Sequence, residues 1–100
     1  MVFSVTPLYA LPVAAIYLRL KGYAILERRC KTPLGEIDIV ARRGAVLVFV
    51  EVKQRARADG EAMALEAVRT DRLLRAAQWF LSKNQRLAGK DIRFDVIFLA

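Results

Sequence analysis

Apolar and polar positions along the chain follow two spacings, one typical of strands and one typical of helices. Strand character marks residues 23–29, 35–41, 46–52 and 92–99. Helical spacing of apolar residues marks residues 12–21 and 61–83, with a break in the second stretch near Thr70. The pattern therefore predicts the element order α-β-β-β-α-β.

Each predicted helix carries one apolar stripe that should face the sheet. Pro12 opens the first helix and Gly22 ends it. The stripe of this helix is Val13, Ile16, Tyr17 and Leu20. The corresponding residues of the long helix are Leu73, Ala76, Ala77, Phe80 and Leu81. Residues 1–11 are expected to form an irregular lead.

One hundred residues are expected to form a single domain. A strand, a crossover helix and a second strand make the fourth strand parallel to the third when the two are neighbours. The sequence therefore predicts a small α/β domain with a mixed central sheet flanked by helices.

A predicted hairpin joins the second and third strands, with Arg43 and Gly44 at its tip. Counting back from this tip places Asp38 opposite Phe49. Side chains alternate along a strand and cross-strand partners share a face, so Asp38, Glu51 and Lys53 should lie on one face. The prediction depends on the parity of the hairpin, because a shift of one residue would separate Asp38 from Glu51.

Two acids and a lysine within apolar strands need a reason, because buried charges are unfavourable unless they are paired. A hard cation such as Mg²⁺ takes oxygen ligands, often one or two carboxylates together with waters and phosphate oxygens. Asp38 and Glu51 suit that role, and Lys53 could reach an attacking water or a phosphate. A cross-strand salt bridge on a solvated face explains the same spacing equally well, because the pattern is short and common.

Longer motifs add to this reading. The segments Gly35-Glu36-Ile37-Asp38-Ile39-Val40-Ala41-Arg42, Leu47-Val48-Phe49-Val50-Glu51-Val52-Lys53 and Arg93-Phe94-Asp95-Val96-Ile97 resemble the YraN family of bacterial proteins. That family is regarded as predicted endonucleases and resembles the PD-(D/E)XK superfamily, which has a restriction-endonuclease-like fold akin to Holliday-junction resolvases. The resemblance implies catalysis by Asp38, Glu51 and Lys53, and Mg²⁺ or Mn²⁺ held by Asp38, Glu51 and Val52.

The first helix departs from the family pattern. Leu11 stands where the family carries an acid that completes the metal site in related nucleases. The leading hypothesis is a magnesium-dependent endonuclease that hydrolyses phosphodiester bonds in DNA, in branched or processed intermediates. Leu11 motivates an alternative, a nucleic-acid-binding protein on the same fold that cuts weakly or not at all.

A formal charge of +7 favours an anionic partner, with DNA a stronger candidate than RNA. The candidate phosphate contacts are Arg42, Arg43, Arg55, Arg57 and Arg72. A basic interaction module without a nucleic-acid substrate fits the charge but leaves the acids unexplained. A homodimer is an open alternative to a monomer.

The remaining residues exclude some classes of active site and indicate the cellular compartment. The absence of histidine excludes zinc–histidine sites and histidine bases. Cys30 is the only cysteine, so a reducing cytoplasm is expected. Pro7 and Pro12 interrupt the uncharged N-terminal run, so no membrane association is expected.

Overall fold

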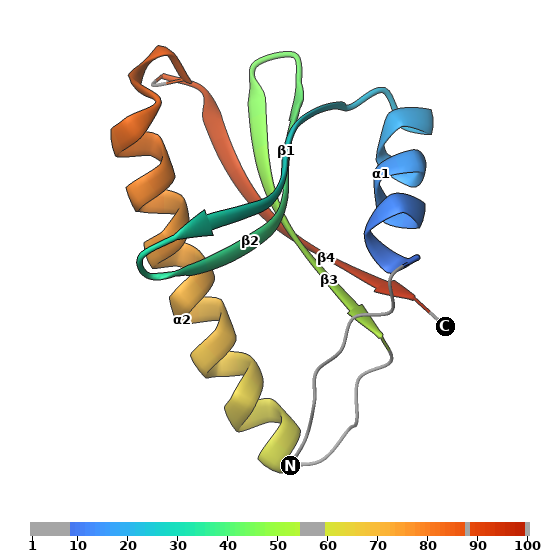
Figure 1. Cartoon of the computed structure of the whole chain (residues 1–100), viewed down its shortest axis with the longest axis vertical. Coiled ribbons are helices and arrows are strands. Elements are labelled where there is room, and N and C mark those ends of the chain that lie inside the picture. Colours follow the sequence, from blue (N-terminus) through green and yellow to red (C-terminus); the bar gives the residue numbers. More distant parts are fainter. Residues whose placement is uncertain (1–8, 55–59, 88, 100) are drawn as a thin grey trace.

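Four strands and two long helices form a three-layer arrangement in which the helices lie on opposite sides of one sheet (Figure 1). The computed structural model describes residues 9–54, 60–87 and 89–99. The elements are α1 (Ala10–Leu20), β1 (Ala24–Thr32), β2 (Gly35–Arg43), β3 (Val46–Gln54), α2 (Gly60–Lys83), a 3₁₀ turn η1 (Gln85–Leu87) and β4 (Asp91–Leu99). This order confirms the predicted α/β fold with a mixed central sheet.

The sheet has the order β1-β2-β3-β4. Strands β1, β2 and β3 form an antiparallel meander, and β4 pairs with β3 in parallel, as the crossover through α2 requires. Several boundaries differ from those predicted, and the predicted break in the long helix is absent. Helix α1 begins at Ala10 rather than Pro12, β1 continues to Thr32, and α2 runs through Thr70 without a break. No described helix is long and apolar enough to cross a membrane.

The predicted stripe of α1 is wrong by two positions. The predicted residues are all exposed, and the helix instead buries Leu11, Ala14, Ala15 and Leu18 against Ile39, Val48 and Val50. Both stripes have helical spacing, so the spacing alone did not separate them. The small side chains of Ala14 and Ala15 allow α1 to lie close to the sheet, which leaves the larger residues on the outer face.

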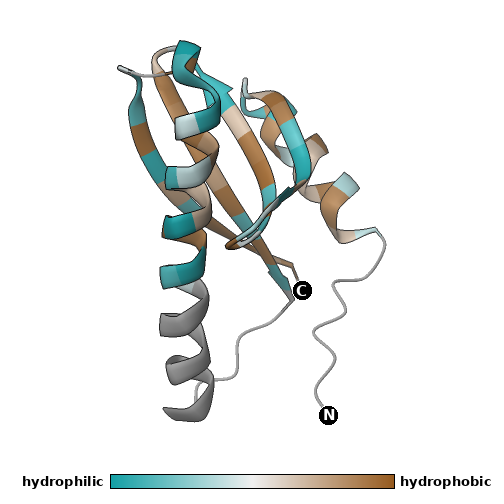
Figure 2. Cartoon of the chain, turned by 60° about the vertical axis from the view of Figure 1, so that its left-hand side comes forward, coloured by the Kyte–Doolittle hydropathy of each residue, from teal (hydrophilic) through white to brown (hydrophobic). Residues whose placement is uncertain are grey.

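The predicted stripe of α2 is confirmed. Leu73, Ala76, Ala77 and Phe80 are buried, and Leu81 packs at the edge of the same cluster. The Phe80 ring meets Phe49 edge-on, with ring centroids 5.8 Å apart. Figure 2 shows long hydrophobic stretches on the strands and alternating hydrophilic and hydrophobic segments on the coloured part of α2.

The register of the β2–β3 hairpin differs from the predicted one by two residues. Arg43 pairs with Val46, so the loop residues are Gly44 and Ala45, and Val40 rather than Asp38 lies opposite Phe49. Gly44 has φ +59°, which suits the first position of a type II′ hairpin turn. A shift of two residues preserves the parity of the paired residues Ile39 to Arg43, but Asp38 lies beyond the last pair, so its face does not follow from this register.

Candidate functional site

The regular alternation of side chains between the two faces of the sheet is interrupted in β2 at Asp38. Ile39 packs in the cluster under α1, whereas Ile37 packs in the cluster under α2. Residues two apart share a face in a regular strand, so the alternation is broken between them. The β2–β3 register also ends at Ile39, which pairs with Val50. In Figure 1 the turn between β1 and β2 lies against α2, away from β3.

The carboxylate of Asp38 lies against the main chain of β3 at this break. The Val52 N–H donates to Asp38 Oδ2 at 2.8 Å. The side chain thus takes the place of a main-chain partner where β2 leaves β3, which satisfies a donor that the ladder no longer pairs. Val52 lies between Glu51 and Lys53 in sequence, so Asp38 is held at the centre of the predicted site.

Glu51 and Lys53 face the α2 side of β3. They alternate with Val50 and Val52, which pack under α1. Lys53 Nζ lies 3.8 Å from Glu51 Oε1, and only 8% of the Lys53 side chain and 19% of the Glu51 side chain are exposed. The two residues lie two apart on β3, so this ion pair is formed within one strand.

Arg29 adds a feature that sequence reasoning did not anticipate. It falls between Arg28, which pairs with Ile39, and Cys30, which pairs with Ile37, and so lies across from Asp38. Its φ is +51°, which lies in the left-handed region. Among the described residues other than glycine, Arg29 alone has a positive φ. Strain of this kind persists where the surrounding structure requires it and is common at functional sites.

Several charges act on the ionisation of Asp38. Burial is the largest influence and raises the pKa of Asp38, and the nearby Glu36 carboxylate raises it further. The hydrogen bond from Val52 and the positive charge of Arg29 act in the opposite direction. A carboxyl group whose pKa is perturbed by burial together with specific charged neighbours is a candidate for a functional site.

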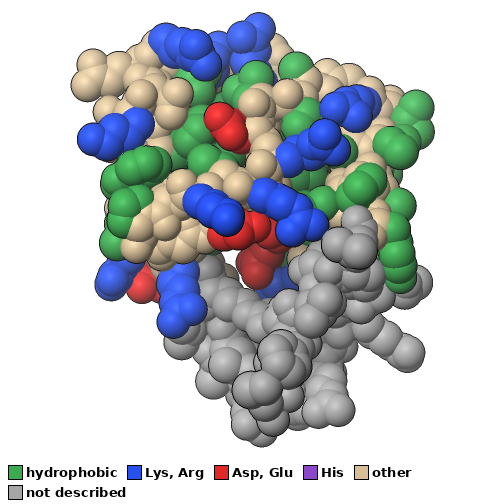
Figure 3. All heavy atoms as spheres, in the orientation of Figure 1, with side chains coloured by type: hydrophobic (Ala, Val, Ile, Leu, Met, Phe, Trp, Pro, Cys, Tyr) green, Lys and Arg blue, Asp and Glu red, His purple; other side chains and the backbone are tan. Residues whose placement is uncertain are grey.

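The predicted phosphate contacts divide into two groups. Arg42 and Arg43 are exposed at the end of β2, and Arg72 is exposed on α2, where its Cβ would lie 3.9 Å from a side chain placed at Gly35. Arg55 and Arg57 lie outside the described residues. Figure 3 shows one face of the molecule, where Lys and Arg side chains are spread around a few acidic ones.

Cys30 does not behave as a nucleophile in this setting. It is partly buried on β1 and packs against the cluster under α2. Burial, followed by the charges of Glu27 and Glu36, raises the pKa of Cys30, which keeps the thiol protonated. A packing role for this residue agrees with the structure.

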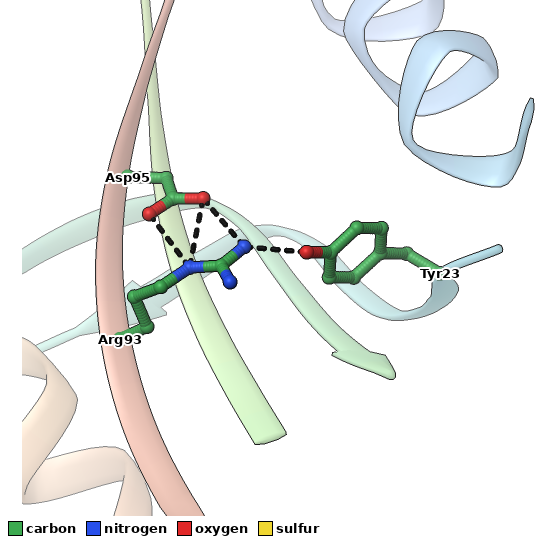
Figure 4. Close-up of polar contacts among 3 residues, drawn as sticks. All are labelled: Tyr23, Arg93 and Asp95. Carbon is green, nitrogen blue, oxygen red and sulfur yellow. Dashed lines mark hydrogen bonds and ion pairs between the residues drawn. The ribbon is translucent and has the colours of Figure 1, made fainter. Parts of the chain in front are cut away.

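A second polar cluster, formed by Tyr23, Arg93 and Asp95, lies at the edge of the sheet (Figure 4). Arg93 Nε donates to Asp95 Oδ1 and Oδ2 at 3.0 and 3.1 Å, and its Nη2 donates to Asp95 Oδ2 at 2.8 Å and to the Tyr23 hydroxyl. The hydrogen bonds to Asp95 and then to Tyr23 raise the pKa of Arg93. Sequence reasoning missed this cluster, although the i, i+2 spacing of Arg93 and Asp95 in a strand already puts them on one face.

The sequence is similar to a group of bacterial proteins. A UPF0102 protein of Rhodopseudomonas palustris strain HaA2 is 49% identical over 87 residues, which cover 87% of this chain and 68% of that protein. UPF0102 proteins of Parvibaculum lavamentivorans and Bradyrhizobium diazoefficiens are 48% and 47% identical over 87 residues, with 87% of this chain and 65% of each relative covered. The chain therefore spans about two thirds of the length of these relatives.

The same similarity extends over most of the chain. Residues 12–99 match the pattern of one family. This range contains the three sequence motifs around Asp38, Glu51 and Arg93. The YraN resemblance is confirmed to this extent, because the matched family is the YraN-like one. The chain belongs to the uncharacterised protein family UPF0102.

Proposed function

We propose that the protein is a metal-dependent endonuclease that hydrolyses phosphodiester bonds in DNA, with branched or processed intermediates as its substrates. The observation that carries the proposal is the position of Asp38. Its carboxylate is held by the Val52 N–H at 2.8 Å, between the residues Glu51 and Lys53 of β3. A partly buried carboxylate that is held at a strand break, against the main chain between an acidic and a basic residue of β3, suits metal-assisted phosphate chemistry.

The available donors fit a hard cation. Asp38 and Glu51 would supply carboxylate oxygens and Val52 its main-chain oxygen, a set that suits Mg²⁺ or Mn²⁺. Within the described part of the chain, no three acidic, Cys or His side chains group into a metal site. A bound ion would therefore keep water and phosphate oxygens among its ligands, as Mg²⁺ prefers. When bound, it would polarise the phosphoryl oxygen and lower the pKa of a ligated water.

The chain's own residues have distinct roles in this proposal. Lys53 presents a cation that is held by Glu51 at 3.8 Å and is largely shielded from solvent. A fixed charge of this kind stabilises the negative charge that develops on the phosphate and can orient the attacking water. Asp38 and Glu51 would hold the metal. The exposed Arg42 and Arg72 position the phosphate backbone without reading its sequence.

A cleavage assay tests the proposal. The purified protein is incubated with junction, flap, nicked and single-stranded DNA in Mg²⁺, in Mn²⁺ and in EDTA. Asp38→Asn and Lys53→Gln should each reduce metal-dependent cleavage by about a hundredfold or more, because each removes a group that acts on the reacting phosphate. DNA binding in EDTA should change little.

Two matched variants control for the change of charge. Asp71→Asn and Lys83→Gln make the same chemical changes at exposed positions on α2, and both should cleave like the wild type. Cleavage that survives at Asp38 and Lys53 alike would place the chemistry elsewhere on the molecule.

One observation favours a second function, DNA binding without cleavage. Leu11 is only 4% exposed and lies in the apolar cluster under α1 with Val50 and Val52. No acid at this position can supplement the two carboxylates of the proposed site. Inertness on every DNA substrate in both metals, together with binding in EDTA, would establish this alternative and end the nuclease proposal.

A further inference from the structure

A pocket of about 410 Å³ lies on the α1 side of the sheet, where the end of α1, the tip of β2 and β4 meet. Its polar lining consists of Tyr17, Lys21, Tyr23, Arg43, Arg93 and Asp95. The volume lies within the range of pockets that bind small organic ligands. The pocket shares no residue with the Asp38–Glu51–Lys53 site, and those residues of β3 face the other helix.

One wall of the pocket is fixed by the cluster of Tyr23, Arg93 and Asp95. Asp95 accepts hydrogen bonds from Nε and Nη2 of Arg93, so the opposite charges of the two side chains balance. The Tyr23 hydroxyl accepts from the same guanidinium, which joins β4 to the segment that follows α1 (Figure 4). The wall is therefore held in place before any ligand binds.

The remaining charge of the pocket is positive. Lys21 Nζ lies 5.6 Å from the Tyr17 ring centroid, and Arg43 Cζ lies 5.7 Å from the Tyr23 ring centroid. Within the described part of the chain, neither cation forms an ion pair with a carboxylate. A side chain at Gly22 would reach 3.9 Å from Arg43 Nε, so the Arg43 side chain crosses the turn that carries Lys21. Two cations that no carboxylate pairs within the described residues therefore line the same pocket.

The main chain beside these cations is the C-terminus of α1, whose partial negative charge opposes an anion. Two carbonyls of the last turn are already hydrogen-bonded, because that of Leu18 accepts from Lys21 and Tyr23 and that of Arg19 accepts from Gly22. The charges of Lys21 and Arg43 therefore have to outweigh this partial charge when an anion binds.

An aromatic surface accompanies the two cations. The Tyr17 side chain is about half exposed and its ring lines the pocket. Unpaired bases stack on tyrosine rings and on guanidinium planes, whereas bases within a duplex are covered on both faces by their neighbours. A concave site with an exposed ring and two cations suits an unpaired nucleotide.

We propose that this pocket binds one nucleotide of a single-stranded nucleic acid, with its phosphate against Lys21 and Arg43 and its base against the Tyr17 ring. The proposal rests on the proposed function only in taking nucleic acid as the ligand. It needs neither metal nor cleavage. A strand held here would lie on the opposite side of the sheet from Glu51 and Lys53, as a single strand that leaves a junction or flap could.

Binding of a fluorescent ten-nucleotide oligothymidine to the full chain in EDTA tests the proposal. Tyr17→Leu and Arg43→Gln should each weaken binding by about fivefold or more, as expected for the loss of a stacking ring or a phosphate contact. Tyr17→Phe keeps the ring, and Arg86→Gln removes an exposed cation of η1, so both should stay within about twofold of the wild type. An equal loss of affinity in Arg43→Gln and Arg86→Gln, or no loss of affinity in Tyr17→Leu, would overturn the proposed binding site.

A second measurement needs no variant and so does not depend on folding of the mutants. Amide chemical shifts of the wild-type protein in EDTA are followed during titration with thymidine monophosphate and with inorganic phosphate. Thymidine monophosphate should shift Tyr17, Lys21, Tyr23 and Arg43 and should bind more tightly than phosphate. Equal affinities for thymidine monophosphate and phosphate would show that the pocket binds only an anion and would overturn the role of the base. Chemical-shift changes confined to Asp38 and its neighbours would overturn the pocket as the binding site.

The two proposals can fail separately. Loss of cleavage with these binding results intact would reject the nuclease function alone. Metal-dependent cleavage that is retained while the oligothymidine and nucleotide results are negative would reject the pocket alone.

Discussion

Asp38 is held at an energetic disadvantage by the fold. Its carboxylate is partly buried, the Glu36 carboxylate lies nearby, and both raise its pKa, while one hydrogen bond from Val52 offsets part of that effect. Functional residues often reduce stability in this way, and replacing them can stabilise the protein. Asp38 therefore allows the site to be tested through stability as well as through activity.

Asp38→Asn should raise the melting temperature of the metal-free protein by a few degrees at pH 7 and leave it unchanged below about pH 3. Because the pKa of Asp38 is raised in the folded state, the folded protein binds more protons than the unfolded chain. Stability is therefore lost as the pH rises from the ordinary carboxyl range near 3.9 through the raised pKa. Asn keeps an oxygen that can accept from Val52 but carries no charge.

Thermal unfolding in EDTA across this pH range measures the difference. Added Mn²⁺ should stabilise the wild type more than the variant, because only the wild type keeps both carboxylates. A variant that is less stable than the wild type at pH 7 would show that the bond to Val52 outweighs the burial of the charge.

Arg29 tests the backbone of the same site. Arg29→Gly and Arg29→Ala both remove the guanidinium, but only glycine adopts φ near +51° without steric conflict. The glycine variant should therefore be more stable than the alanine variant by about 1 kcal/mol in urea unfolding. Equal stabilities would mean that the left-handed conformation at this position carries no strain.

At the scale of the elements, α1 has two apolar sides and only one is buried. Leu18 is 4% exposed, whereas Leu20 is 83% exposed. Leu18→Ala should reduce the free energy of unfolding by about 2–4 kcal/mol, because it leaves a cavity in the cluster under α1. Leu20→Ala should change it by less than about 0.5 kcal/mol. Similar losses for both would contradict the observed orientation of the helix.

The sequence predicted the kinds of element and the parity of the strands better than their exact placement. The faces of Glu51 and Lys53 follow from alternation along β3, which a register error of two residues does not disturb. The orientation of α1 could not be predicted, because Val13, Ile16, Tyr17 and Leu20 have the same spacing as the residues that are buried. The bond from Val52 to Asp38 was also beyond reach, because it needs the break in β2, which no local pattern marks.

At the scale of the whole molecule, the charge of +7 should make DNA binding strongly dependent on salt. Each phosphate that the protein neutralises contributes about 0.9 to the slope of log affinity against log salt concentration. Arg42→Gln and Arg72→Gln should each lower that slope by about one, and they should weaken all sequences alike. Binding titrations at several salt concentrations measure this, and an unchanged slope would exclude the altered residue from the interface.

Strand β4 is the last strand in the sheet order and, among the described strands, pairs only with β3, in parallel, after the crossover through α2. The β1–β3 meander closes short loops, so it can form early in folding, whereas β4 must wait until α2 has brought it across. Its amides should show an alternating pattern of hydrogen exchange, with every second one bonded to β3 and slow and the others open at the edge and fast. Local opening of β4 would separate Arg93 and Asp95 from Tyr23. The pocket that these residues line should therefore lose its order before the Asp38 site does. Uniform protection along β4 would instead mean that a further strand or a second molecule covers this edge.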